Sequence, residues 1–294
     1  MGRPVIRLIH YASEKGKPMP FFETSDRTSL YYTDWGTGTP VVFLSSWSVG
    51  GDMWQYQMVP LSNQGLRCIA YDRRGHGRSD DPGRGYEFDT LADDLAALIA
   101  QLDLPDVTLV GHSMGCNEIA RYLSRHGTSR IARVALIGTL TPFILRTADN
   151  PKGVPKIALD QTIAALLRDR PSYVTDGAIK FFGLGSKWPG PPVLSSEMVQ
   201  WIIRLALESS LKALIECQRA VWETDFRSDM QAFTVPTLII HGDSDQSAPL
   251  DLFGRRTSQA ITGSQLTVYE GGPHGLFITE KDRLNRDLLA FIQG

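Results

Sequence analysis

The sequence predicts an α/β protein: a mostly parallel, doubly wound β-sheet with helices on both faces and an inserted helical segment. Short β-rich runs alternate along the chain with amphipathic helical patterns, which is typical of such a sheet. Several of the runs are apolar throughout, as expected for strands that are buried on both faces. The 294 residues show no break in composition, and the length suits one large domain or two small ones.

Seven segments have the composition of β-strands. Residues 29–35 form the first, and Gly36 and Gly38 mark the turn that follows it. Residues 41–45 form a short apolar strand that suits the centre of the sheet. The other predicted strands are 67–72, 107–111, 134–137, 235–241 and 265–269.

Apolar residues at intervals of three and four predict helices between these strands. The predicted helices are 91–102, 116–123 and 284–292, each with a row of apolar side chains. No internal repeat or low-complexity tract interrupts the pattern. We therefore expect the strands and helices to alternate from the first strand to the end of the chain, with one exception.

The exception is the segment 139–234, where the alternation stops. It contains helical stretches at 157–167 and 198–220 and a Pro/Gly-rich stretch at 188–192, but no convincing strand. We expect residues 1–138 and 235–294 to form the α/β core and 139–234 to form a helical cap inserted in it. The cap would cover the carboxyl ends of the strands, where open α/β sheets place their sites.

The composition limits the classes of partner. The net charge of -2 and the absence of a basic block argue against nucleic acid. No window has the roughly 18 apolar residues that cross a membrane, and residues 1–20 lack the apolar region of a secretory signal. The three cysteines show no metal-ligand spacing. We expect a cytoplasmic protein with a small-molecule substrate; a homo-oligomer is compatible with the sequence.

The motif Gly111-His112-Ser113-Met114-Gly115 predicts a nucleophile. It follows a predicted strand and precedes a predicted helix, which is the setting of the G-x-S-x-G nucleophile elbow. The turn is so sharp that a Cβ at either glycine would collide with neighbouring backbone. Ser113 would lie at its apex, strained but accessible, at the N-terminus of a helix that favours negative charge.

A serine hydroxyl needs a base, and His274 is the best candidate among the six histidines. It lies in a Gly/Pro loop just after the last predicted strand, where it can reach over the edge of the sheet. His10 lies near the N-terminus without a catalytic context, and the ordinary explanations for His76, His126 and His241 are structural. His112 is adjacent to Ser113, and neighbouring side chains diverge.

The acid that orients the base should follow a strand between these two residues, because the chain order in this arrangement is Ser, acid, His. Asp243 and Asp245 both follow the predicted strand 235–241. Residue spacing does not show which of the two is the acid. The aspartate that is not the acid would be a turn residue that bonds its own backbone. The acid would hold the tautomer of the imidazole and stabilise the imidazolium.

The oxyanion of a tetrahedral intermediate requires two converging N–H donors. The elbow supplies the backbone N–H of Met114. The loop after strand 41–45 supplies the second, which we assign to the backbone of Trp47.

With these motifs in place, the chain resembles the α/β-hydrolase superfamily. Within it, the chain is similar to the branch of cofactor-free (non-heme) haloperoxidases, aryl esterases and related lactamases, over nearly its whole length beyond about residue 22. Besides the elbow, the resemblance rests on the stretches 52–58, 71–79, 153–155, 223–230 and 235–246.

The resemblance implies a triad of Ser113, Asp245 and His274, with oxyanion donors at Trp47 and Met114, and it favours Asp245 over Asp243. It implies no cofactor and no metal. In two places the chain departs from the branch. Ser45-Ser46 precedes Trp47 where the family usually has His-Gly, and the stretch before Phe22 is longer than usual.

The leading hypothesis is a serine hydrolase that cleaves a small or aryl carboxylic ester through an acyl-Ser113 intermediate. Apolar cap residues could line its pocket, although most such side chains pack the core of a helical segment and none is assigned to substrate: Phe143, Ile144, Phe181, Phe182, Trp188 and Trp201. The alternatives with the same triad are a perhydrolase or haloperoxidase, in which peroxide is the acyl acceptor, and an amide or lactam hydrolase. A ligand receptor with a vestigial site is disfavoured by the intact triad. Haloalkane and epoxide hydrolases use an aspartate nucleophile, which Ser113 excludes.

Overall fold

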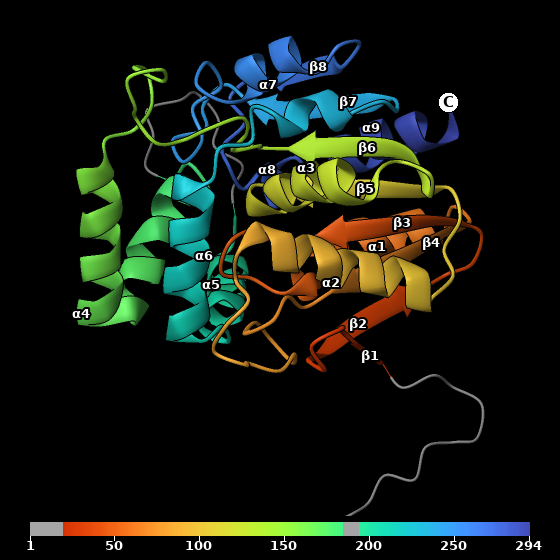
Figure 1. Cartoon of the computed structure of the whole chain (residues 1–294), viewed down its shortest axis with the longest axis horizontal. Coiled ribbons are helices and arrows are strands. Elements are labelled where there is room, and N and C mark those ends of the chain that lie inside the picture. Colours follow the sequence, from red (N-terminus) through yellow and green to blue (C-terminus); the bar gives the residue numbers. More distant parts are fainter. Residues whose placement is uncertain (1–19, 185–193) are drawn as a thin grey trace, which may run out of the picture.

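The computed structural model of the chain describes residues 20–184 and 194–294. Two segments discussed above, the N-terminal stretch 1–19 and the Pro/Gly-rich stretch 188–192, lie outside the described residues. Within the described part, the chain forms one eight-stranded sheet with helices on both faces (Figure 1). This architecture confirms the predicted α/β class.

The sheet has the strand order β1-β2-β4-β3-β5-β6-β7-β8. The pairs β1–β2 and β2–β4 are antiparallel and all other neighbours are parallel. The strands are β1 (Phe21–Glu23), β2 (Ser29–Trp35), β3 (Thr39–Leu44), β4 (Leu66–Tyr71), β5 (Val107–His112), β6 (Ile131–Ile137), β7 (Thr237–Gly242) and β8 (Gln265–Tyr269). All seven predicted strands are present, and only the three-residue β1 was missed, because it is too short to show a pattern.

The central strands are buried on both faces. Every residue of β5 and β7 is buried, as the continuous apolar runs predicted. Helices α2 (Phe88–Gln101) and α3 (Met114–His126) cover the face that is in front in Figure 1, while α1 (Gln55–Ser62) and α9 (Lys281–Gln293) cover the back. Shorter elements complete the layers: η1 (Gly51–Trp54), η2 (Asp229–Ala232), α7 (Gly254–Ala260) and α8 (Leu276–Thr279). No helix in the described ranges is both long and apolar enough to cross a bilayer.

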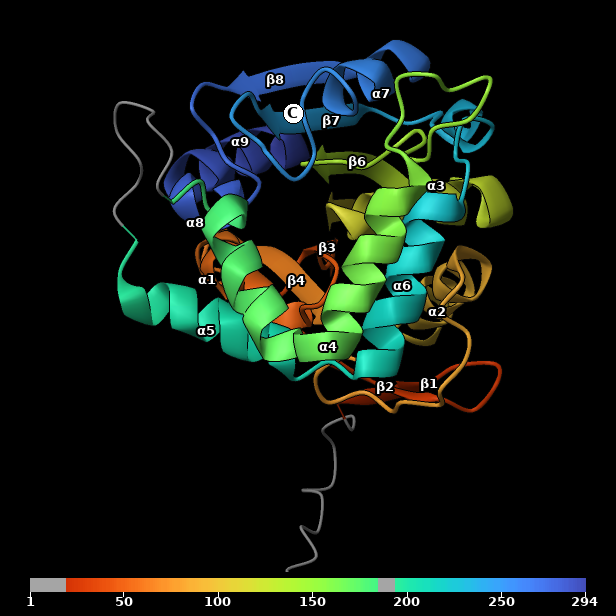
Figure 2. The ribbon, with the colours of Figure 1, turned by 90° about the vertical axis from the view of Figure 1, so that its left-hand side faces the viewer.

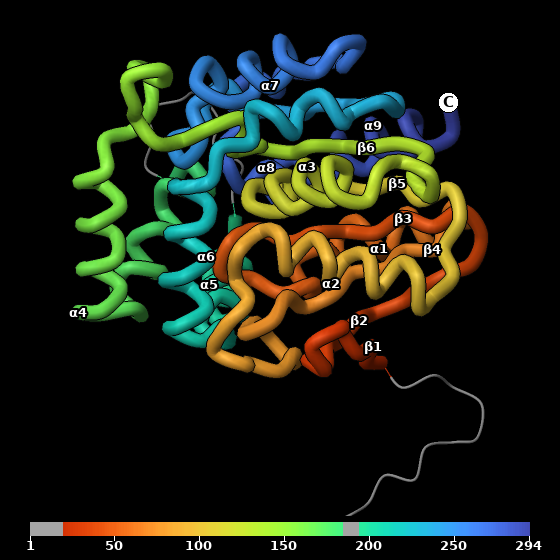
Figure 3. Tube along the Cα trace, in the orientation of Figure 1, coloured from red at the N-terminus to blue at the C-terminus, as the bar shows by residue number. Residues whose placement is uncertain are grey.

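After β6 the chain leaves the sheet, and its described residues form three α-helices and η2 before it returns to β7 (Figure 3). We call α4 (Lys156–Phe181), α5 (Ser196–Leu207) and α6 (Leu211–Glu223) the cap helices. They stand together at one end of the sheet, facing the carboxyl ends of the parallel strands (Figures 1 and 2). That these helices belong to a separate cap spanning 139–234 stays a prediction.

Two cap helices differ from their predicted form. The prediction of one helical stretch at 198–220 is wrong, because a turn separates α5 from α6. The Ser210 side chain accepts a hydrogen bond from the Ala213 N–H and so caps the start of α6. Helix α4 is longer than the predicted 157–167 but is interrupted at Asp169, whose φ of -160° and ψ of 84° are not helical. Pro171 follows two residues later and disfavours a continuous helix.

Candidate active site

Ser113 lies at the apex of the turn between β5 and α3. Its φ of 55° and ψ of -117° are an uncommon conformation for a residue other than glycine. The Ser113 N–H donates to the carbonyl of Ile137 at 2.9 Å, which ties the turn to the neighbouring strand β6. The side chain is 3% exposed and borders a cavity. The structure thus gives Ser113 the strained, accessible position that the elbow motif predicts.

The glycines of the elbow are required by close packing. A Cβ on Gly115 would lie 2.4 Å from the carbonyl oxygen of Leu44, in strand β3. A Cβ on Gly111 would lie 2.8 Å from the backbone of Gly115 itself. Both distances are far below van der Waals contact, so the turn can form only with glycine at these two positions.

His274 lies in the loop after β8, as predicted, and is 3% exposed. Its Nδ1 donates a hydrogen bond to Oδ2 of Asp245 at 2.6 Å. This bond fixes the proton on Nδ1 and leaves Nε2 as the free acceptor of the ring. A neutral imidazole in this tautomer is suited to accept a proton from a hydroxyl group.

Asp245 is held by three hydrogen bonds. Its Oδ1 accepts from the N–H groups of Ser247 at 2.9 Å and Ala248 at 2.6 Å, and its Oδ2 accepts from His274. Burial raises the pKa of this carboxyl, but the adjacent His274 and His241 rings and the Ala248 N–H together outweigh burial, so that the pKa is lowered overall. The aspartate is therefore ionised and its orientation is fixed.

The two candidate acids differ in their contacts. Asp243 is exposed, and its Oδ1 accepts the Gly271 N–H at 2.8 Å, so that it stabilises the loop after β8. Of the two aspartates, Asp245 is the one that bonds the His274 ring. The unused aspartate bonds backbone, as expected for a turn residue, although the backbone belongs to a neighbouring loop.

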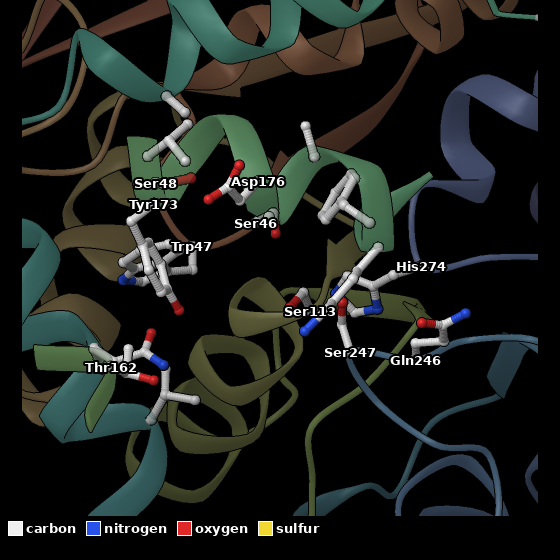
Figure 4. Close-up of a pocket in the computed structure, with 18 of the residues that line it drawn as sticks. Ser46, Trp47, Ser48, Ser113, Thr162, Tyr173, Asp176, Gln246, Ser247 and His274 are labelled. Carbon is white, nitrogen blue, oxygen red and sulfur yellow. The ribbon is translucent and has the colours of Figure 1, made fainter. Parts of the chain in front are cut away.

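Ser113 and His274 border the same cavity, which has a volume of about 670 Å³. Figure 4 shows them together at one end of it, with Gln246 and Ser247 nearby, while Trp47 and Tyr173 lie farther along. Of the apolar cap residues considered as pocket lining, Ile144 and Phe181 border the cavity. Phe143, Phe182 and Trp201 are not among the lining residues, and Trp188 lies outside the described residues.

The two predicted oxyanion donors come from separate segments, the start of α3 and the loop after β3. Met114 is the first residue of α3, so its N–H has no acceptor within the helix. The Trp47 N–H donates no hydrogen bond to any atom of residues 20–184 and 194–294. Trp47 borders the cavity, and its indole Nε1–H donates to the carbonyl of Leu214 in α6 at 3.0 Å. Trp47 therefore lies at the cavity with its backbone N–H unpaired within the described residues, and the Met114 N–H begins α3 directly after Ser113.

A buried arginine holds the Ser45-Ser46 segment that replaces the usual His-Gly. Arg73 donates to the carbonyls of Ser45 at 2.9 Å and Ser46 at 3.4 Å. Its guanidinium also pairs with Glu118 at 2.6 Å, and Glu118 accepts the hydroxyl of Tyr71 at 2.9 Å. Burial lowers the pKa of Arg73, but the adjacent Glu118 carboxylate raises it above its ordinary value, so the arginine stays charged.

Sequence reasoning missed two further residues that support the site. His112 Nε2 donates to the His274 carbonyl at 2.8 Å, and burial lowers the pKa of His112 to about 3, so it is neutral. The Phe181 ring packs edge-to-face on the His274 ring, with centroids 5.2 Å apart. His112 belongs to the elbow motif and Phe181 to the predicted pocket wall, but their contacts with His274 depend on distant parts of the chain.

Within the described ranges of the chain, no cluster of three or more histidine, cysteine, aspartate or glutamate side chains could hold a metal ion. The Ser113 hydroxyl and the His274 imidazole border the cavity, and the Asp245 carboxylate bonds that imidazole, so the chain order is Ser, Asp, His. Such a set can perform nucleophilic acyl transfer.

Comparison with known proteins agrees with this fold. A family model of the α/β hydrolase fold matches residues 39–178. The chain is 42% identical to the non-heme chloroperoxidase CPO-A1 of Kitasatospora aureofaciens, over 93% of this chain and 99% of that protein. It is 34% identical to a bifunctional esterase/perhydrolase of Acinetobacter calcoaceticus, over 94% of this chain and 100% of that protein. A bromoperoxidase structure from Bacillus anthracis superposes with a TM-score of 0.88 at 38% identity, covering 93% and 99% of the two chains.

The fold and the elbow define an α/β hydrolase. The chain belongs to this superfamily and, within it, to the branch of the non-heme haloperoxidases, because the similarity extends over nearly the full length of the relatives. The resemblance drawn from the sequence motifs is thereby confirmed.

Proposed function

We propose that the protein is a carboxylic-ester hydrolase that acts through an acyl-Ser113 intermediate. One observation carries the proposal: an imidazole with its proton fixed toward a buried carboxylate borders the same cavity as a serine at a strained elbow. The relative named as an esterase/perhydrolase supports the same chemistry.

In the proposed reaction, Ser113 Oγ attacks the ester carbonyl while His274 Nε2 accepts the hydroxyl proton. The Asp245 carboxylate stabilises the imidazolium that forms, without taking the proton itself. The N–H groups of Trp47 and Met114 would bind the tetrahedral oxyanion. Collapse of the intermediate breaks the C–O bond, and His274 returns the proton to the leaving alcohol. A water molecule, deprotonated by the same imidazole, then releases the acid and restores Ser113.

The cavity suits a small or aryl ester. Its volume of about 670 Å³ lies within the usual range for small-molecule sites. Apolar residues form much of its wall: Leu140, Ile144, Val154, Phe181, Trp222 and Leu252. These side chains can surround an acyl or aryl group, and the polar residues near Ser113 are left to orient the carbonyl.

The decisive experiment compares wild type with Ser113→Ala on p-nitrophenyl esters of increasing acyl chain length. We expect turnover by the wild type, and a loss of about 10³-fold or more in the variant because the nucleophile is gone. Equal, negligible turnover by both proteins would contradict the proposal. Equal and substantial turnover would show that another group performs the reaction.

A second activity, perhydrolysis, is favoured by the names of several relatives. Here hydrogen peroxide replaces water and deacylates Ser113, so that the acyl group leaves as a peracid, which then oxidises halide. We expect bromination that depends on acetate and peroxide and disappears in Ser113→Ala; a requirement for added heme or metal would contradict it. Amide or lactam hydrolysis would use the same residues and is tested by including an anilide in the panel.

A cytoplasmic location is part of this proposal. The three cysteines, Cys68, Cys116 and Cys217, are free and buried. Free thiols are usual in proteins of reducing compartments. Cell fractionation with a tagged full-length chain tests the location.

A further inference from the structure

The backbone of Ser48, next to the proposed oxyanion donor Trp47, has an uncommon conformation. Its φ is 70°, in the region that favours glycine. Ser48 is half-buried and borders the cavity. A serine adopts such a φ stably only where surrounding contacts hold it there. Because Trp47 directly precedes Ser48, the contacts that hold the loop of residues 45–48 also restrict the position of the Trp47 N–H.

The cap helices supply those contacts. In the turn between α5 and α6, the Ser209 hydroxyl donates to the Ser48 carbonyl at 2.7 Å. Ser209 is 1% exposed, and its own carbonyl accepts a hydrogen bond from Arg170, beside the interruption of α4. One residue before Ser48, the Trp47 indole is bound to the Leu214 carbonyl in α6.

The two halves of the loop are thus anchored to different parts of the molecule. The carbonyls of Ser45 and Ser46 are bound by Arg73 of the core. The Ser48 carbonyl and the Trp47 side chain are bound by the cap helices and the turn between them. The backbone N–H of Trp47 lies between the two anchors, so its direction depends on both.

We propose that Ser209 is a positioning residue for the oxyanion hole: its hydroxyl holds Ser48 at positive φ and thereby directs the Trp47 N–H toward the carbonyl oxygen of the substrate. This inference rests on the proposed ester hydrolysis. Ser209 is not among the residues that border the cavity, so it acts only through the loop. The cap turn then contributes to stabilising the transition state as well as enclosing the substrate.

The test is the kinetics of Ser209→Ala on a p-nitrophenyl ester. Removing a whole oxyanion donor typically lowers kcat by about 10²–10³-fold. We expect misdirection of one donor to lower kcat by at least about tenfold, with KM within about twofold, because the hole acts mainly in the transition state. Ser209→Thr keeps the hydroxyl and should recover most of kcat.

Two further variants separate positioning from general stability. In the double variant Ser48→Gly/Ser209→Ala, glycine adopts the positive φ unaided, and we expect kcat to recover most of the loss. Ser210→Ala is the matched control, because the Ser210 hydroxyl caps α6 and bonds Asp81 and does not bond the loop. It should lower the melting temperature and leave kcat unchanged.

Wild-type kcat in Ser209→Ala overturns the proposal, as does a double variant that is as slow as Ser209→Ala alone. If Ser209→Ala does not fold, Ser209→Cys is measured instead, because a thiol of similar size is only a weak hydrogen-bond donor. A wild-type kcat in Ser209→Cys would overturn the proposal equally. Ser113→Ala is measured in parallel. Activity in that variant would remove the proposed function itself, whereas an inactive Ser113→Ala beside a fully active Ser209→Ala would remove this inference alone.

Discussion

The imidazole of His112 donates a hydrogen bond from Nε2 to the backbone carbonyl of His274, 2.8 Å away. The two rings also pack against each other, with centroids 4.8 Å apart. The residue before the proposed nucleophile therefore supports the loop that carries the proposed base. The elbow and that loop are thus joined by a buried hydrogen bond and by ring packing.

Replacing His112 should separate the hydrogen bond from the packing. In His112→Gln, an amide N–H can take the place of Nε2, and we expect activity close to that of the wild type. In His112→Leu, the His274 carbonyl loses its partner, which should lower the free energy of unfolding by about 1–3 kcal/mol. Displacement of the base should lower kcat by roughly 10- to 100-fold. Urea unfolding and ester kinetics measure both effects; a fully active His112→Leu would contradict the role.

The buried, neutral His112 should also make stability depend on pH. Burial lowers its pKa to about 3, from an ordinary value of about 6.5. The unfolded chain binds this proton below pH 6.5 and the folded chain does not, so the contribution is complete above pH 6.5 and is lost as the pH falls toward 3. Each pH unit inside this window removes about 1.4 kcal/mol.

Comparison of wild type with His112→Gln isolates this contribution. Other groups titrate in the same range, such as Asp94, where burial raises the pKa to about 6. We expect the wild type to lose about 2–3 kcal/mol more than His112→Gln between about pH 7.5 and pH 4.5, as measured by urea unfolding. Identical losses in the two proteins would show that His112 does not remain neutral.

The two aspartates after β7 offer a matched pair of substitutions. Asp245→Asn removes the charge that stabilises the imidazolium and fixes its tautomer, so kcat should fall by about 10³–10⁴-fold. Asp243→Asn keeps an oxygen that can accept the Gly271 N–H, and kcat should stay within about twofold, as for most exposed substitutions. Similar losses in both variants would argue against the assignment of Asp245.

Two glycines offer a similar contrast for stability. A Cβ on Gly115 would lie 2.4 Å from the Leu44 carbonyl, so Gly115→Ala should lower the free energy of unfolding by about 2–3 kcal/mol or more. A methyl group on Gly177, in α4, would meet no neighbouring element of the described chain within 4 Å, so Gly177→Ala should raise this free energy by about 0.5–1 kcal/mol. Thermal and urea unfolding of both variants check the signs; a stable Gly115→Ala would mean that the elbow can move away from β3.

The elements that could be predicted from the sequence are those whose signal is local. Apolar runs identified the strands, and the G-x-S-x-G motif between a strand and a helix identified the elbow. His274 was found because it lies in a Gly/Pro loop after the last strand. The choice between Asp243 and Asp245 needed a family resemblance, because both closely follow β7 and only the side-chain directions differ.

The supporting contacts could not be predicted, because they join distant parts of the chain. His112 and the His274 carbonyl are 162 residues apart, and Ser209 and the Ser48 carbonyl are 161 apart. The break between α5 and α6 was missed for a related reason. The residues on both sides of it have helical spacing, and only its serines, which can cap a helix or occupy a turn, hint at an interruption.

The interruption of α4 at Asp169 divides this helix into two halves, and the Asp169 carboxylate accepts the Ser172 N–H that begins the second half. Asp169, Ser172 and Tyr173 all border the cavity. Substitutions or length changes in the second half can therefore reshape one wall while the backbone hydrogen bonds of the first half stay intact. Changes at this interruption of α4 can therefore alter which substrates fit the cavity without changing the residues proposed to perform the chemistry.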